Sequence, residues 1–201
     1  MPKNNDPKDL ASYINCLSIL ENNASLLYTA LADKIEDSLV KSLILTIASD
    51  SQKHSISLKG VGESIAKPEG KPKDCEKKLG EAWRVVDTFY REIVNKEKIT
   101  DSELPQLAEK LAVLESILGE EYYMFVQLKT LQLMMKEISQ IYNINLGELK
   151  GIFSSIINDE EHHRELLETV KEILDKKKPK IRDNTPVVKY QNPDSWIAST
   201  Y

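Results

Sequence analysis

The sequence predicts an all-α fold, a four-helix bundle with an additional crossover helix and an extended C-terminal arm. The chain of 201 residues contains only seven glycines, which is typical of long helices rather than of short strands joined by turns. Apolar residues recur at alternating three- and four-residue spacing over most of the chain, as on the inward face of a bundle helix. This periodicity disappears after residue 177, where three prolines indicate an extended arm.

The first predicted helix, 7–36, begins with Asp6 as its N-cap and Pro7 at its first helical position. Its inward face is formed by Leu10, Tyr13, Leu17, Leu20, Ala24, Leu27, Leu31 and Ile35. A break at 36–38 leads into a second helix, 38–65. We expect its inward face to be formed by Leu39, Leu43, Thr46, Ile47, Asp50, His54, Leu58 and Val61.

The second half of the predicted domain, 1–177, contains three further helices. A loop rich in Pro and Gly at 66–74 precedes a helix at 74–97, with Leu79, Trp83, Val86, Tyr90 and Ile93 on one face. About 24 residues at 1.5 Å each span roughly 36 Å, enough for a crossover between two hairpins. The last two helices are predicted at 103–143, with Pro105 tolerated in the first turn, and at 146–177. Residues 178–201, with Trp196, form the arm.

Composition excludes several classes of function. The formal net charge is −5 and no basic stripe occurs, so nucleic acid is not an expected partner. No run approaches 18 apolar residues, and the N-terminus has no apolar signal region, so we expect no membrane association and a cytoplasmic location. Cys16 and Cys75 are isolated, which excludes a zinc ribbon and favours reduced thiols.

The chain contains an internal repeat of helical hairpins. The stretch LSILENNASLLYTAL (17–31) aligns with LAVLESILGEEYYMF (111–125), which pairs Glu21 with Glu115 and Tyr28 with Tyr122. The stretch IASDSQKHSISL (47–58) aligns with IINDEEHHRELL (156–167). This second alignment pairs Asp50 with Asp159, Ser51 with Glu160 and His54 with His163. Tyr28 and Tyr122 are expected to be core aromatics whose hydroxyls bind inward carboxylates.

The repeat indicates a metal site. Glu160 and His163, three residues apart, project from one face of a helix, and together a carboxylate oxygen and an imidazole nitrogen suit Fe, Mn or Zn. In the first hairpin, which turns near residue 37, Glu21 lies 16 residues before the turn, and Ser51 and His54 lie 14 and 17 residues after it. These residues should therefore lie at one level of the bundle.

The carboxylate on the fourth helix is less well defined by the sequence. Counting from a turn near 144–145 favours Glu121, which continues the apolar series Leu111, Leu114, Leu118 and Phe125. The repeat favours Glu115, and Glu120 and the neutral Gln127 are further alternatives. The predicted metal ligands are Glu21, His54, Glu121, Glu160 and His163.

On these motifs the chain resembles the ferritin-like superfamily, specifically rubrerythrin-type domains, over roughly residues 8–176. The resemblance implies a di-iron or di-manganese site in which two helices each give one Glu and two each give a Glu-x-x-His pair. Glu160-x-x-His163 matches this pattern, and Glu21 followed by Tyr28 fits the first helix. The second helix departs from it, because Ser51 stands where the family has Glu before His54. The rubredoxin-like zinc ribbon of full rubrerythrins is absent.

Two functions follow as alternatives. The first is a ferritin-like metal-binding protein that holds Fe, in a di-iron or mononuclear site, or Zn or Mn. If it is redox-active, the resemblance implies a rubrerythrin-like oxidoreductase that reacts with peroxide or dioxygen. The second is a non-catalytic scaffold or interaction protein that has kept the fold and lost the di-iron chemistry. We also expect a homodimer, because residues 117–135 are apolar on more than one helix face.

Overall fold

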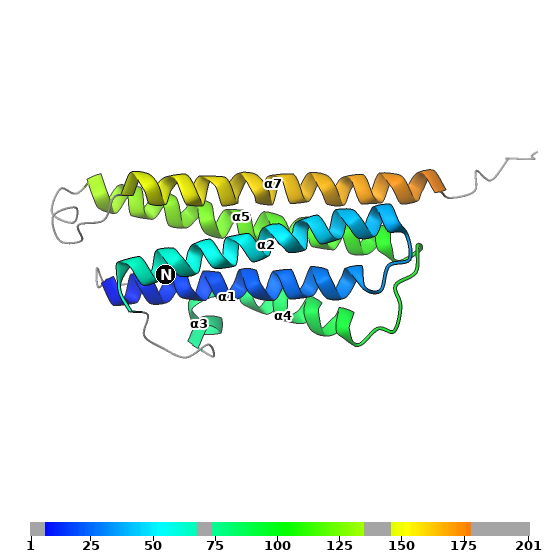
Figure 1. Ribbon diagram of the computed structural model, residues 1–201, viewed down its shortest axis with the longest axis horizontal. Helices are drawn as coiled ribbons and strands as arrows, with labels where there is room; N and C mark the ends of the chain where they lie inside the picture. The colour runs from blue at the N-terminus through cyan, green and yellow to red at the C-terminus, as the bar shows by residue number, and fades with distance from the viewer. Residues whose placement is uncertain (1–6, 68–73, 135–145, 178–201) are drawn as a thin grey trace, which may run out of the picture.

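The computed structural model describes residues 7–67, 74–134 and 146–177, and every regular element in these ranges is a helix (Figure 1). The prediction of an all-α fold is confirmed. The elements are α1 (Pro7–Ala32), α2 (Ser38–Ile65), α3 (Cys75–Leu79), α4 (Glu81–Val94), α5 (Leu104–Met134) and α7 (Leu146–Lys177). Within the described ranges, none of them has a stretch both long and apolar enough to cross a membrane.

Several predictions fall wholly or partly on residues whose placement is not described, among them the Asp6 N-cap, the loop at 66–74 and the end of the helix at 103–143. The arm, 178–201, lies outside the described ranges altogether. The apolar surface behind the expected homodimer, 117–135, lies outside them in part, because the side chains of 123, 124 and 126–134 and the whole of 135 are not described. The homodimer therefore stays a prediction.

Helices α1 and α2 form an antiparallel pair. The turn between them is closed by Asp37, whose carboxylate accepts hydrogen bonds from the backbone N–H groups of Leu39 and Val40, both at 2.9 Å, and so caps α2. Along the pair, the hydroxyl of Ser18 donates to the carbonyl of Ser55, and that of Ser25 to Ala48, at 2.8 Å each. These buried bonds fix the register that places Glu21 opposite His54.

Helices α5 and α7 form the second antiparallel pair, and the four long helices lie side by side (Figure 1). At one end of the pair Lys171 forms an ion pair with Glu109. Further along, Gly119 lies against Glu160, and a Cβ at Gly119 would be 3.5 Å from the Glu160 Cβ. Helix α4 packs mainly against α1 and returns the chain to the start of α5, as a crossover requires.

The crossover is divided, whereas the sequence predicted one helix over 74–97. Gly80 separates α3 from α4 and has a φ of +58°, in the left-handed region where residues with a Cβ are strained. The apolar face is largely retained across the break. Val86 and Ile93 are buried, and Trp83 and Tyr90 are half-buried.

The inward face of α2 differs from the prediction near its start. Leu39 is 55% exposed and Thr46 is exposed, so both predictions are wrong. The buried line on this helix is instead Val40, Ile44, Ile47, Ser51, His54, Leu58 and Val61. Leu39 and Thr46 each precede a member of this line by one residue, and one helical residue rotates the side chain by about 100°. From Ile47 onward the two faces agree except at one turn, where Ser51 is buried and the predicted Asp50 is half-buried.

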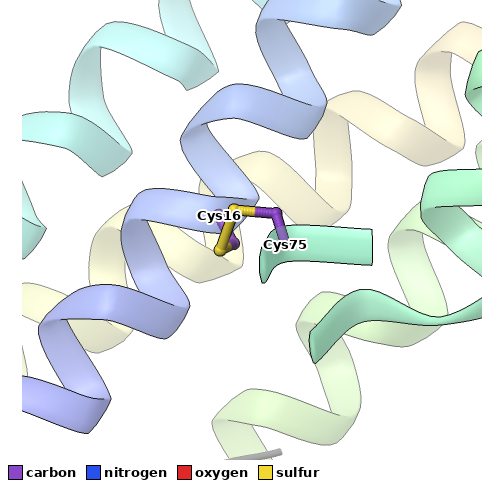
Figure 2. The surroundings of a disulfide bond; sticks show 2 residues. All are labelled: Cys16 and Cys75. Atoms are coloured by element: carbon purple, nitrogen blue, oxygen red, sulfur yellow. A yellow bond between two sulfur atoms is a disulfide. The ribbon is translucent and has the colours of Figure 1, made fainter. Parts of the chain in front are cut away.

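The prediction of two separate, reduced cysteines is wrong. Cys16 on α1 and Cys75 at the start of α3 form a buried disulfide (Figure 2). The two residues are 59 positions apart in the sequence, and only the docking of α3 against α1 brings them together. Disulfides are rare in the reducing cytosol, so this bond does not favour the predicted cytoplasmic location.

Candidate metal centre

Five ionisable side chains meet in the interior of the four long helices. They are Glu21 on α1, His54 on α2, Glu115 on α5, and Glu160 and His163 on α7, and none is more than 4% exposed. Each continues the apolar line of its helix, so burial follows from the hydrophobic periodicity. Glu21, for example, is four residues after Leu17 and three before Ala24, and both of these residues are completely buried.

The five side chains form two groups that share one carboxylate. Glu21, His54 and Glu160 form one group, and Glu115, His163 and Glu160 form the other. Within each group the ligand atoms lie within 4.8 Å of one another. The Nδ1 atom of His54 is 3.6 Å from Glu21 and 3.3 Å from Glu160, and Nδ1 of His163 is 3.0 Å from Glu115 and 3.7 Å from Glu160. Glu160 therefore lies at the centre of the cluster.

The histidines are oriented by aspartates of the opposite hairpin. Asp159 on α7 lies 2.9 Å from Nε2 of His54, and Asp50 on α2 lies 3.4 Å from Nε2 of His163. In each ring the outer nitrogen is thus occupied, and Nδ1 is directed toward the carboxylates. A carboxylate on the outer nitrogen fixes the tautomer and the ring plane of a metal-binding histidine.

The tyrosines of the repeat cross between the hairpins in the same way. The hydroxyl of Tyr28 donates to Glu115, and that of Tyr122 donates to Glu21, as expected for inward carboxylates. Burial, followed by the neighbouring carboxylates, raises the pKa of both tyrosines well above its ordinary value. Both phenols therefore remain protonated hydrogen-bond donors and hold the two outer glutamates in place.

Some buried atoms of the cluster have no hydrogen-bond partner among the described residues, although both histidines lie within ion-pair distance of Glu160, and these atoms fit a cation. Within the described part of the chain, Glu21 Oε2, His54 Nδ1 and both carboxylate oxygens of Glu160 are buried and have no hydrogen-bond partner. An unpaired buried carboxylate is strongly unfavourable unless it binds a cation or a hydrogen-bond donor. These four atoms belong to the two groups described above, so the donor set fits one or two divalent metal ions.

In the metal-free protein, bound protons supply the positive charge that a metal ion would otherwise bring to the cluster. Burial alone lowers the pKa of His54, but the carboxylates of Glu160 and Glu21 outweigh burial and raise it to about 11. His163 follows the same pattern, because Glu115 and Glu160 outweigh burial and raise its pKa to about 10. Burial, and then the charge of Glu160, raises the pKa of Glu115 above its ordinary value. All three shifts favour extra protons in the cluster.

We predict that the metal-free protein loses stability as the pH rises from 7 to 10. A histidine with a raised pKa in the folded state stabilises the fold fully below its unfolded pKa near 6.5, and that contribution disappears as the pH rises through the folded value of about 10 or 11. Denaturant unfolding in the presence of chelator should show the free energy of unfolding falling by about 2 kcal/mol or more. Stability that is constant or rising over this range would contradict the prediction.

The structure places Glu121, the preferred ligand of the fourth helix, outside the two groups, and places its alternative Glu115 in one of them. Glu121 is half-buried, accepts a hydrogen bond from Tyr13, and belongs to neither group, whereas Glu115 belongs to one of them. The preference for Glu121 rests on counting from a turn near 144–145. In the structure Gly119 lies against Glu160 and Glu109 pairs with Lys171, and in this register Glu115 lies 3.0 Å from His163. The internal repeat, which paired Glu115 with Glu21, was the better guide.

The other four predicted ligands, Glu21, His54, Glu160 and His163, are brought together. Ser51, which stands where the repeat has Glu160, is 2% exposed, and its hydroxyl donates to the carbonyl of Ile47. Sequence reasoning missed the crossed aspartates, although the repeat aligns Asp50 with Asp159. The spacing of residues along one helix does not show which residue of another helix they will contact.

Comparisons of this chain with protein-family models, with curated proteins and with solved structures find no match.

Proposed function

We propose that this chain is a ferritin-like metal-binding protein with a dinuclear site held by Glu21, His54, Glu115, Glu160 and His163. The observation that carries the proposal is the buried cluster itself, in which four ligand atoms have no hydrogen-bond partner within the described residues. Two antiparallel helix pairs that place the cluster between them support the ferritin-like resemblance.

The ligand types suit iron, manganese and zinc alike, because all three metals bind carboxylate oxygen and imidazole nitrogen. Bound iron or manganese would supply redox chemistry toward peroxide or dioxygen. The residues of the chain have other tasks. Glu160 would contribute to both metal positions. Asp50 and Asp159 orient the histidines, and Tyr28 and Tyr122 hold the outer glutamates.

The metal content of the purified protein tests the proposal. Protein prepared without chelator should carry roughly 0.5–2 equivalents of Fe, Mn or Zn per chain by elemental analysis, the range expected for a partly or fully loaded two-metal site. The chain offers a matched pair of variants in its two adjacent histidines. His163→Gln changes a completely buried ligand and should lower the metal content, whereas His162→Gln changes an exposed residue and should leave it unchanged.

The scaffold alternative makes the opposite prediction. A protein that is metal-free as purified, and that binds neither Fe(II) nor Zn(II) added without oxygen, would overturn the metal-binding proposal. Equal metal content in His163→Gln and His162→Gln would place any bound metal outside this cluster.

A further inference from the structure

Two clefts approach the buried cluster from different sides of α7. One lies between α5 and α7, has a volume of about 460 Å³, and is lined on its buried side by Glu115 and Glu160. The other lies between α2 and α7, has a volume of about 330 Å³, and reaches His54 and Asp159. Each of these clefts is a candidate route by which an ion could reach the cluster.

We propose that divalent cations reach the cluster through the α5–α7 cleft, a route that rests on the proposed function. Its charge suits a cation, because the cleft is lined by four carboxylates and one guanidinium: Glu115, Glu120, Glu160, Glu161 and Arg164. Glu120 and Glu161 are exposed at its mouth, while Glu115 and Glu160 are buried. Carboxylates of one sign along a cleft raise the local cation concentration and the association rate.

A second, independent observation links this cleft to a ligand. Glu160 is 3% exposed, lines the cleft, and has both carboxylate oxygens without a hydrogen-bond partner in the described part of the chain. Glu160 is also the residue that the two ligand groups share. A cation that passes along the cleft would therefore meet the central ligand of the site directly.

Gly119 keeps this passage open. It lines the cleft, and a Cβ there would lie 3.5 Å from Cβ and 4.0 Å from Cγ of Glu160. One added carbon would make ordinary contact with Glu160. A longer side chain would extend into the space beside that carboxylate.

The α2–α7 cleft suits a cation poorly. Its charged residues are Lys53, an exposed ammonium group, and Asp159, whose carboxylate is engaged with His54. Asp159, which also lines this cleft, occupies Nε2 of His54, whereas Nδ1 of that ring faces Glu21 and Glu160. An ion on this route would meet a like charge and an occupied nitrogen.

The rate of Co²⁺ uptake by the metal-free full-length protein tests the route, with stopped-flow absorbance as the readout. Gly119→Leu should slow uptake by at least about tenfold and leave the final stoichiometry unchanged, because it narrows the passage without removing a ligand. Ser155→Leu places the same side chain on an exposed position of the other cleft and should leave the rate unchanged. Gly119→Ala, which adds only a Cβ, should fold normally and show a smaller delay.

Charge variants test the same route, because one should lower the rate of Co²⁺ uptake and another should raise it. Replacing Glu120 and Glu161 together by Gln should lower the rate by about three- to tenfold at low salt, and the effect should fade at high salt. Arg164→Gln removes the cation at the mouth and should raise the rate. If Ser155→Leu slows uptake and Gly119→Leu does not, the proposed route is wrong, but the proposed function still stands. A wild-type protein that binds no Co²⁺ would overturn both the inference and the proposed function.

Discussion

Replacing Glu160 by Gln is expected to weaken metal binding at both positions of the site together. Glu160 contributes to both ligand groups, whereas every other ligand contributes to one. The substitution keeps the size of the side chain but removes the charge that two cations would share. We expect the affinity for Co²⁺, measured by titration of metal-free protein, to fall by at least roughly a hundredfold, above the range found when a group that only supports a ligand is removed.

Three companion variants make the Glu160 experiment specific. Glu168→Gln removes the same charge from an exposed position of the same helix and should leave both binding events unchanged. Glu115→Gln should weaken one binding event, because Glu115 belongs to one group only. Glu121→Gln should weaken neither, since Glu121 binds Tyr13 instead. If the affinity for Co²⁺ falls more in Glu121→Gln than in Glu115→Gln, that result would contradict the register in which α5 packs against the other helices.

Replacing Ser51 by Glu is expected to strengthen binding of the second ion and to destabilise the metal-free protein. Two divalent cations held by three carboxylates keep a net positive charge, and each repels the other. Ser51 is buried and is the counterpart of Glu160 in the repeat, so a carboxylate there should offset this repulsion. We expect the affinity for the second Co²⁺ to rise by about tenfold or more, which is about 1.4 kcal/mol.

Without metal the same carboxylate has no cation to balance it. The free energy of unfolding of metal-free Ser51→Glu should therefore fall by about 1–3 kcal/mol in denaturant titrations. Gln52→Glu adds the same charge at the neighbouring exposed position and should change neither quantity. If Ser51→Glu matches the wild type in second-ion affinity and in metal-free stability, residue 51 does not face the cluster.

The positions of the ligands along the chain could largely be predicted from the sequence. Hydrophobic periodicity put Glu21, His54 and His163 on inward faces, because a helix turns each of them toward the same side as its apolar neighbours three and four residues away. The internal repeat paired Glu115 with Glu21 and Ser51 with Glu160. Where the repeat and a count from the turn disagreed, at Glu115 and Glu121, the repeat gave the residue that lies in the cluster.

The break at Gly80 was harder to predict. A glycine within an amphipathic pattern is tolerated in many helices, and the apolar spacing from Leu79 to Ile93 continues across it. Whether the backbone adopts a positive φ there depends on how α3 and α4 dock against α1, which is a tertiary contact. The pairing of Cys16 with Cys75 depends on the same docking.

By itself, the sequence determined the all-α fold and most of the inward faces, including those of Glu21, His54 and His163, because helix periodicity acts over neighbouring residues. Only the tertiary structure decided which side chains meet across the helices. The crossed contacts of Asp159 with His54 and of Tyr122 with Glu21 join residues 105 and 101 positions apart. Glu160 on α7 is shared by the two groups because α7 packs against α5 and also meets His54 on α2 and Glu21 on α1. Such contacts depend on the relative translation of packed helices, and spacing along one helix carries no information about that translation.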